Sequence, residues 1–398
     1  MNFLFTYVAM YTGGIETLIL RMSEWLINND HKVDLLLIRN EGELLPKINP
    51  DVNVISFGEF TEINFVKFCN NKSKSKNYDV IYSFSPLTTW MSLLLRSKMR
   101  PYPIVLNGVY HLYDYKLFGD KYTQYIFNKI LPDRCKIFMT QTVREEHEII
   151  FKRKFANSVI WPLPINISKF ENVKRIPKKF KIVSVGRLTS FKTYNIYMLD
   201  VVKKLIEANF AVEYYIYGTG DLLLEIEAKI IQLQLMDHVF LKGTIDYDKM
   251  SDAFEDAYVS IGMGTSIIEA GLCKVPSIVA IAYSDTAQTH GYIHDLPNYN
   301  CGELIFDYPL LDLFECFKKL FSLSDTEYLQ LSNKSYAELK SQYDINKLMK
   351  NLFCEIDSIK KENIFIKEIN APYNYIGQKS IRILKAKVIR SLNTVNNN

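Results

Sequence analysis

A glycine and two cations follow one apolar run in the second half of the sequence. The run Lys181–Val185 leads directly into Gly186 and Arg187, and Lys192 comes five residues after the arginine. An arginine offers a planar fork of donors for phosphate oxygens, a lysine offers a point charge, and a glycine lets the backbone approach a ligand. Because both cations follow the end of an expected strand, the spacing favours an anion site. The alternative interpretation is a pair of solvated surface residues.

A second loop with glycine precedes an expected helix. After the run Tyr258–Gly262 the sequence continues through Gly264, and Thr265 or Ser266 occupies the expected N-cap position. Free N–H groups at such a helix start favour a diphosphate. Glu269 follows one turn later. Its carboxylate could accept hydrogen bonds from sugar hydroxyls or, alternatively, complement the helix dipole.

Two weaker glycine motifs, Gly13-Gly14 and Gly218-Thr-Gly220, also stand between an expected strand and an expected helix. Short glycine turns are common, so these motifs carry little weight alone. Asp246-Tyr-Asp248 has the spacing of a carboxylate pair that binds metal ions. It precedes a helical stretch, so we interpret it as a helix cap and expect no metal site.

Short apolar runs alternate with amphipathic segments, which predicts parallel strands joined by helices. The strands expected in the first half are Phe3–Ala9, Val33–Ile38, Val52–Ser56, Val80–Phe84, Ile104–Leu106, Ile137–Thr140 and Val159–Pro162. Those expected in the second half are Lys181–Val185, Val212–Tyr217, Val239–Lys242, Tyr258–Gly262, Ser277–Ala282 and Leu304–Phe306. The expected helices are Glu16–Asn28, Tyr122–Ile130, Asn195–Ala208, Leu222–Leu235, Tyr247–Glu255 and Ser266–Cys273.

This pattern predicts an α/β fold with two Rossmann-like domains that face each other across a deep cleft. Ligands of such sheets bind beyond the carboxyl ends of the strands, so the cleft is the expected site. Prolines and a basic polar stretch mark the junction. We expect a first domain at residues 1–165, a second at 166–360 and a tail at 361–398.

The composition of the 398 residues, with 48% hydrophobic and 23% charged, is that of a folded globular protein. The net charge of +4 is too small to indicate a nucleic-acid partner. Six cysteines without a CxxC pair favour a reducing compartment. The apolar N-terminus lacks the basic start of a signal peptide, and no apolar run is long enough to span a membrane. A cytoplasmic location is therefore expected.

The segment Ile376–Leu392 interleaves basic with apolar residues at three- and four-residue steps. A basic amphipathic helix of this kind can lie on an anionic membrane surface. A solvated terminal helix packed on the body is the alternative. The first interpretation predicts peripheral attachment at the inner face of the plasma membrane.

Taken together, the sequence resembles glycosyltransferase family 4, whose members have the GT-B fold and retain the configuration of the transferred sugar. The similarity covers roughly residues 1–355. The motifs that carry it are Gly13-Gly14-Ile-Glu16, Pro164-Ile-Asn166 with Phe170, Val185-Gly186-Arg187-Leu188 with Lys192, Gly218-Thr-Gly220, Leu241-Lys242-Gly243, and Ser266-Ile-Ile-Glu269-Ala270 through Pro276.

The resemblance implies a role for each matched residue. Arg187 and Lys192 would hold the donor diphosphate, and Glu269 would bind the nucleotide ribose. His111, which follows a first-domain strand, would lie near the transferred sugar, with a purely structural role as the alternative. The remaining donor-site residues would be Gly13, Gly14, Gly186, Gly218, Gly220, Lys242, Gly243, Gly264, Thr265 and Ser266.

The implied reaction is transfer of a hexosyl group from a UDP- or GDP-linked sugar, without a cofactor or metal. The implied acceptor is a saccharide, expected to be lipid-linked, in bacterial O-antigen, capsule or exopolysaccharide assembly. The sequence departs from the family at Ile261, where a first glutamate normally contacts the donor sugar. This leaves the sugar open. Three alternatives remain: a sugar-nucleotide epimerase, a silent sugar-nucleotide binding protein and a dinucleotide oxidoreductase.

Overall fold

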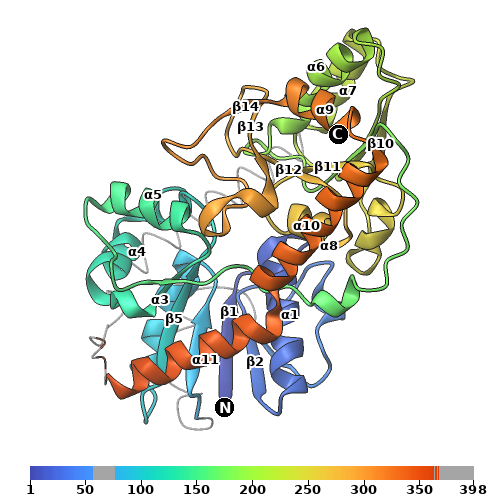
Figure 1. Ribbon diagram of the computed structural model, residues 1–398. Coiled ribbons are helices and arrows are strands. Elements are labelled where there is room, and N and C mark those ends of the chain that lie inside the picture. Colours follow the sequence, from blue (N-terminus) through green and yellow to red (C-terminus); the bar gives the residue numbers. More distant parts are fainter. Residues whose placement is uncertain (57–76, 363, 365, 367–398) are drawn as a thin grey trace, which may run out of the picture. The chain divides into compact units, whose positions relative to one another are not determined.

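Each half of the chain forms its own α/β unit in the computed structural model, which describes residues 1–56, 77–362, 364 and 366. The first unit comprises Met1–Phe138, Glu146–Ile160 and the described residues from Leu352 onward. The second comprises Met139–Glu145 and Trp161–Asn351. Helices α5 (Gln141–Phe151) and α11 (Ile345–Lys361) therefore each contribute to both units (Figure 1).

The first unit contains a seven-stranded sheet of order β3-β2-β1-β4-β5-β6-β7, in which every neighbouring pair is parallel. All seven predicted strands are confirmed. Their runs are apolar because a parallel sheet is covered on both faces. The strands are β1 (Asn2–Tyr7), β2 (Lys32–Leu37), β3 (Asn53–Ser56), β4 (Val80–Ser83), β5 (Ile104–Val109), β6 (Lys136–Phe138) and β7 (Val159–Ile160).

Helices α1 (Gly14–Asn28), α3 (Pro86–Arg96) and α4 (Lys121–Tyr125) belong to the first unit. Helix α3 was not predicted, although its start has a clear local cause: the Ser85 hydroxyl accepts a bond from the N–H of Thr88, and Pro86 occupies the first turn. The shorter turns are η1 (Leu45–Lys47), the π-helical turns η2 (Asp114–Phe118) and η3 (Ile126–Ile130), and η4 (Asp133–Cys135).

The second unit contains another seven-stranded sheet, of order β10-β9-β8-β11-β12-β13-β14. Five strands are parallel and were predicted: β8 (Lys181–Val185), β9 (Glu213–Tyr217), β10 (Val239–Gly243), β11 (Val259–Gly262) and β12 (Ser277–Ala280). Two antiparallel strands, β13 (Gln288–Tyr292) and β14 (Leu311–Asp312), complete the edge.

The predicted strand Leu304–Phe306 is wrong. Leu304 and Phe306 are exposed at 39% and 63%, and the N–H of Ile305 donates to the side-chain Nε2 of His290 (3.0 Å) rather than to a main-chain carbonyl of a strand. The apolar residues at this point lie on the surface, and the more polar strand β13 takes the place in the sheet.

The helices of the second unit are α6 (Tyr194–Glu207), α7 (Leu223–Gln232), α8 (Thr265–Leu272), α9 (Leu313–Phe321) and α10 (Asp325–Tyr343). The predicted helical stretch at 247–255 is a 3₁₀ helix, η6 (Tyr247–Phe254), and Asp246 caps it as expected, accepting from the N–H of Asp248 (3.0 Å). Short turns are η5 (Ile167–Lys169), η7 (Ile293–Asp295) and η8 (Pro297–Tyr299).

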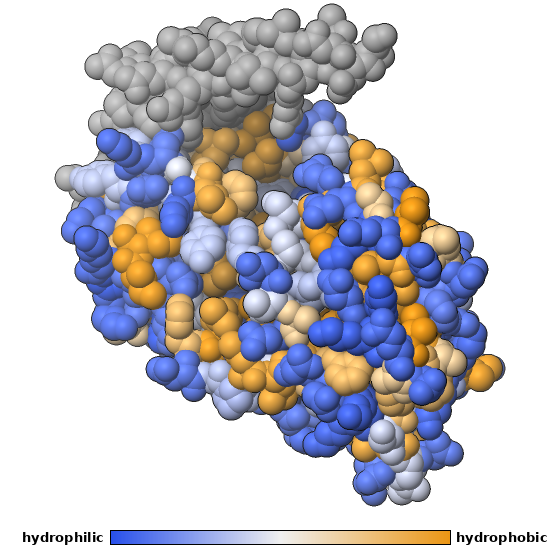
Figure 2. Space-filling view, turned by 90° about the horizontal axis from the view of Figure 1, so that it is seen from above, coloured by the Kyte–Doolittle hydropathy of each residue, from blue (hydrophilic) through white to orange (hydrophobic). Residues whose placement is uncertain are grey.

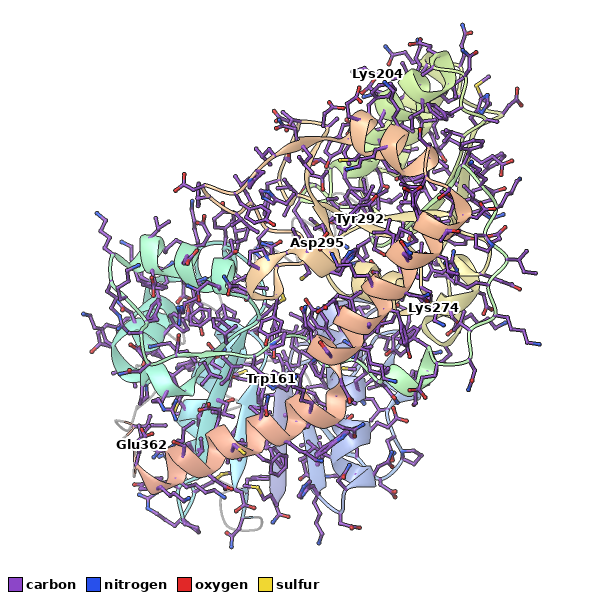
Figure 3. All side chains as sticks on the ribbon, in the orientation of Figure 1. Trp161, Lys204, Lys274, Tyr292, Asp295 and Glu362 are labelled. Carbon is purple, nitrogen blue, oxygen red and sulfur yellow. The ribbon has the colours of Figure 1, made fainter. Side chains whose placement is uncertain are left out.

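Trp161 fixes the point where the chain enters the second unit. Its indole Nε1 donates to the carbonyl of Leu348 in α11 (2.8 Å). Figure 3 shows Trp161 beside this helix. Ile165 then bridges to Asp344, accepting from the N–H of Ile345 (3.0 Å). These bonds hold the linker that the proline-rich sequence predicted.

On the face of the molecule shown in Figure 2, hydrophilic residues alternate with separate apolar patches. Exposed apolar side chains include Leu117 and Phe118 in the first unit. Among the described helices, none combines the length and the apolar character needed to cross a bilayer. The cysteines that the structure describes are all free thiols, while Cys69 and the basic segment Ile376–Leu392 lie outside the described residues.

Candidate active site

The loops that follow strands β8, β9 and β10 lie against one another. The N–H of Gly186 donates to the carbonyl of Tyr217 (2.9 Å), and the N–H of Gly218 donates to the carbonyl of Gly243 (2.7 Å). A Cβ atom on Gly218 would stand 1.9 Å from the carbonyl oxygen of Gly186, which no side chain could tolerate. The glycines therefore allow three strand ends to meet at the carboxyl edge of the sheet.

The same packing continues one turn further along the β8 and β9 loops. Leu188 donates its N–H to the carbonyl of Thr219 (2.9 Å), and a Cβ atom on Gly220 would stand 2.3 Å from the Leu188 carbonyl oxygen. The sheet order reverses its direction between β8 and β11, so this edge is also the topological switch point. Ligands of doubly wound sheets bind at such a point.

Arg187 and Lys192 form a positive pair at the end of β8. Lys192 is half-buried, and its Nζ atom lies 2.9 Å from the point that a Cβ atom on Gly186 would occupy. Burial lowers the pKa of Lys192 to about 8, and the positive charge of Arg187 adds to this shift. Among the described residues, neither cation forms an ion pair with a carboxylate. An anion placed here would relieve the repulsion between the two charges.

Helix α8 starts at the end of β11, beside this pair of cations along the sheet. Its N-cap is Gly264, with φ of 68° and no side-chain cap, so the predicted N-cap at Thr265 or Ser266 is wrong. The loop closes because the Gly264 N–H donates to the Cys301 carbonyl (2.6 Å), which leaves Thr265 and Ser266 in the first helical turn. The first amides of an α-helix have no partner within the helix and favour anions.

Ser266 ties this helix start to the neighbouring strand. Its hydroxyl donates to the carbonyl of Val185, the last residue of β8, over 2.7 Å. Further along α8, Glu269 is 2% exposed. Ile261 is fully buried in the hydrophobic core of the second unit. No acid from that position reaches the strand ends.

Lys242 lies on β10 itself, one residue before Gly243. Its exposed side chain places Nζ 5.7 Å from the centroid of the Tyr215 ring, on the neighbouring strand β9. Gly243 and Gly264 share another property, since a Cβ atom at either position would have open space around it. Both glycines have φ of 68°, a conformation that other residues rarely adopt.

The remaining predicted residues lie in the first unit. Gly13 is the N-cap of α1 and Gly14 its first residue. A Cβ atom on Gly13 would stand 2.4 Å from Oε2 of Glu16, whose Oε1 accepts a bond from the Tyr7 hydroxyl (3.3 Å). This glycine therefore lets the glutamate fold back over the start of its own helix.

His111 follows β5 in a loop that one buried carboxylate organises. Asp114 accepts bonds from the N–H groups of Tyr110 (2.9 Å) and His111 (3.1 Å), and burial raises its pKa to about 7. The N–H of Tyr113 donates to Nδ1 of His111 (3.1 Å), and burial lowers the pKa of the imidazole. The ring is therefore neutral at pH 7 with its proton on Nε2, which makes Nε2 a hydrogen-bond donor.

Two buried residues near the strand ends of the second unit were not predicted from the sequence as part of the site. Glu303 accepts a bond at Oε2 from the Cys301 N–H (3.2 Å), and burial raises its pKa to about 7. Tyr194 begins α6 with a fully buried ring. Neither residue belongs to a motif with its own spacing, so only the fold brings them to this edge. Among the described residues, no group of three or more metal-ligating side chains is present.

Comparison with known proteins agrees with this architecture. Residues 166–287 match the family Glycosyl transferases group 1. Over 198 residues the chain is 26% identical to the poly(ribitol-phosphate) alpha-N-acetylglucosaminyltransferase of Staphylococcus aureus (strain COL), covering 47% of this chain and 38% of that protein. The chain thus spans well under half of this curated relative.

Solved structures share the fold over most of the chain. A glycosyltransferase from Rickettsia africae ESF-5 superposes with a TM-score of 0.68 at 17% identity, covering 90% of this chain and 98% of its own. Alr3699/HepE from Anabaena, solved with UDP and glucose, gives 0.67 at 15% identity over 90% and 100%. The chain has the GT-B fold, and the part of its second unit from residue 166 to 287 is similar to the family Glycosyl transferases group 1.

Proposed function

We propose that this protein is a family 4 glycosyltransferase that moves a hexosyl group from a nucleoside diphosphate sugar to a saccharide acceptor in cell-surface polysaccharide synthesis. The observation that carries the proposal is the pair Arg187 and Lys192, which lacks a carboxylate partner among the described residues and stands at the switch point of the group 1 domain. The S. aureus relative, named for transfer of N-acetylglucosamine to poly(ribitol-phosphate), supports the same class of product.

The chemistry follows from where negative charge develops. As the glycosidic bond to the donor breaks, charge grows on the departing diphosphate. Arg187, Lys192 and the first amides of α8 stabilise that charge, each contact lowering the barrier by about 3 kcal/mol. These groups stand in for a metal ion, so the reaction is metal-independent. The acceptor hydroxyl attacks from the face of the leaving group and passes its proton to a diphosphate oxygen. Because attack and departure use the same face, the anomeric configuration is retained.

On the first unit, His111 contacts the transferred sugar. Its Nε2–H is held as a donor by the bond that Tyr113 makes to Nδ1, and a neutral imidazole does not compete for the diphosphate. Glu269 binds the ribose hydroxyls. The donor is UDP-linked in the first instance, because Alr3699/HepE was solved with UDP and glucose, and GDP-linked in the second.

The acceptor is a lipid-linked saccharide, and the protein is peripheral at the inner face of the plasma membrane. The basic amphipathic pattern of Ile376–Leu392 motivates this part of the proposal. Sedimentation of the full chain with anionic vesicles, compared with a chain ending at Tyr375, tests it. Equal binding by both chains would rule out the tail as the attachment.

The first experiment on the donor site is thermal unfolding of the full chain with UDP, GDP, ADP, CMP and NAD. A ligand at about 100 times its dissociation constant stabilises the native state by about 2.7 kcal/mol. We expect one nucleoside diphosphate to raise the unfolding temperature and Arg187→Ala to abolish the effect. Lys204→Ala, which removes an exposed cation on α6 (Figure 3), is the matched control and should keep it.

Turnover then separates the competing functions. Release of nucleoside diphosphate that depends on a saccharide acceptor supports the transferase. Conversion of the donor sugar without acceptor would indicate an epimerase, and tight donor binding without any turnover would indicate a silent binding protein. Stabilisation by NAD alone would contradict the proposal and favour an oxidoreductase.

A further inference from the structure

Tyr194 carries a buried hydroxyl at the edge of the sheet where the proposed diphosphate site lies. The residue is fully buried, and its hydroxyl has no hydrogen-bond partner in the part of the chain that the structure describes. That oxygen lies 3.7 Å from the point that a Cβ atom on Gly186 would occupy, and 3.7 Å from the equivalent point on Gly262. It therefore sits between the ends of the neighbouring strands β8 and β11.

A buried hydroxyl without a partner costs free energy, so its persistence calls for a reason. The chain satisfies a similar hydroxyl close by: the Tyr214 hydroxyl donates to Oδ1 of Asn195 (2.5 Å) and also lies 3.0 Å from Oγ of Ser184. Burial raises the pKa of the Tyr194 phenol and outweighs the lowering effect of the neighbouring Asn195 side chain, which does not reach hydrogen-bonding geometry with the hydroxyl. The phenol thus keeps its proton at neutral pH and is able to donate it in a hydrogen bond.

The surroundings of this hydroxyl are those of an anion site. Gly186 and Gly262 supply no side chains, so the Tyr194 hydroxyl and the Lys192 ammonium can lie close to their backbone. Nζ of Lys192 lies 2.9 Å from the Cβ point of Gly186, and Cβ of Ile267 lies 3.9 Å from that of Gly262. Ile267 is the third residue of α8, so its N–H has no partner within the helix. An ammonium, a hydroxyl and the first turn of α8 thus lie around the ends of β8 and β11.

We propose that the Tyr194 hydroxyl donates a hydrogen bond to a phosphate oxygen of the bound nucleoside diphosphate and forms the inner wall of its subsite. This inference rests on the proposed donor site and adds a ligand that the family motifs do not contain. Tyr194 is a binding residue for the leaving group, so it acts on the ground state and on the departing diphosphate alike.

The test is calorimetric titration of the full chain with UDP and, separately, with inorganic pyrophosphate. Tyr194→Phe removes only the hydroxyl, and we expect its affinity for both probes to fall roughly tenfold, the usual effect of losing a bond to a charged group. The unfolding temperature of the free protein should not fall, because the lost hydroxyl has no partner there. Tyr197→Phe is the matched control: its hydroxyl is also buried on α6 without a partner among described residues, and its affinities should stay within twofold.

Each other outcome overturns the inference in a distinct way. If Tyr194→Phe binds both probes normally while Arg187→Ala does not, the hydroxyl is no ligand and the proposed function stands. If only UDP binding weakens, the hydroxyl contacts the nucleoside and not phosphate. If the unchanged protein binds neither probe, this inference and the proposed donor site both fail.

Discussion

The ammonium of Lys192 occupies the side of Gly186 on which any other residue would carry its side chain, 2.9 Å from the Cβ point. A methyl group at residue 186 would collide with the end of a flexible side chain, which can swing away, but φ of +159° also strains any residue other than glycine. Gly186→Ala should therefore lower the stability by about 1–2 kcal/mol, mainly through the backbone. It should also displace Nζ and weaken binding of nucleoside diphosphate. Urea unfolding and calorimetry on the same sample measure both effects. A large loss of stability with unchanged affinity would contradict this account.

Gly218 differs from Gly186 because its neighbour is main chain. A Cβ atom would stand 1.9 Å from the Gly186 carbonyl oxygen, and φ is +150°. Gly218→Ala should cost about 3 kcal/mol or more of unfolding free energy, since the β8 and β9 loops must separate. Gly243→Ala is the control: φ is +68° but the space is open, so about 1–2 kcal/mol is expected from the backbone alone. Equal losses would show that steric contact is unimportant here.

The pKa of Lys192 predicts how binding depends on pH. Because that pKa is lowered to about 8, raising the pH through 8 removes the positive charge from the free protein. The affinity for nucleoside diphosphate should fall over pH 7–9, and Lys192→Gln should bind weakly with a flat profile. Stability should move the other way: the unfolded state binds more protons between pH 8 and 10.5, so this group makes the native state more stable as pH rises there. Titrations at several pH values, with Lys204→Gln as control, check both signs.

Asp114 predicts a pH effect on the first unit. Its pKa rises from 3.8 to about 7 on folding, so the native state binds more protons than the unfolded state between these values, and stability falls as pH increases through that window. Asp114→Asn keeps an acceptor oxygen and should flatten this slope. Asp114→Ala loses the bonds from Tyr110 and His111 and should cost about 1–3 kcal/mol.

Urea unfolding at pH 5, 6 and 8 measures these slopes. Glu303, whose pKa is also raised to about 7, contributes a slope of the same sign, so Glu303→Gln is the companion variant. An unaltered slope in both variants would show that neither carboxyl group is protonated on folding.

The buried parallel strands could be predicted from sequence because their apolar runs are continuous. Gly186, Gly218 and Gly243 could be placed at strand ends for the same reason. Strand β13, Gln288-Thr-His-Gly-Tyr292, could not, because it is polar and pairs antiparallel at the edge. The apolar run Leu304–Phe306 was wrongly predicted as a strand, because a short apolar run has the same pattern in an exposed loop as in a buried strand.

Predictions from local sequence were also wrong where a residue distant in the sequence sets the geometry. The N-cap of α8 was expected at Thr265 or Ser266, but the Gly264 N–H donates to the Cys301 carbonyl and the Ser266 hydroxyl donates to the Val185 carbonyl. No sequence pattern marked Tyr194 as a binding residue, since a tyrosine at the start of an amphipathic helix is common. Its position becomes informative only once β8 and β11 are neighbours.

The return of helix α11 to the first unit has a consequence for how the protein is made. Phe353 packs on Phe3 and Trp25, with ring centroids 5.7 Å and 6.0 Å apart, and stacks on His31. A ribosome releases those first residues more than 300 residues before Phe353 emerges. The first unit therefore cannot complete its packing against α11 until nearly all of the described chain has been synthesised. A nascent chain halted before residue 352 would present a bare aromatic face to chaperones and proteases.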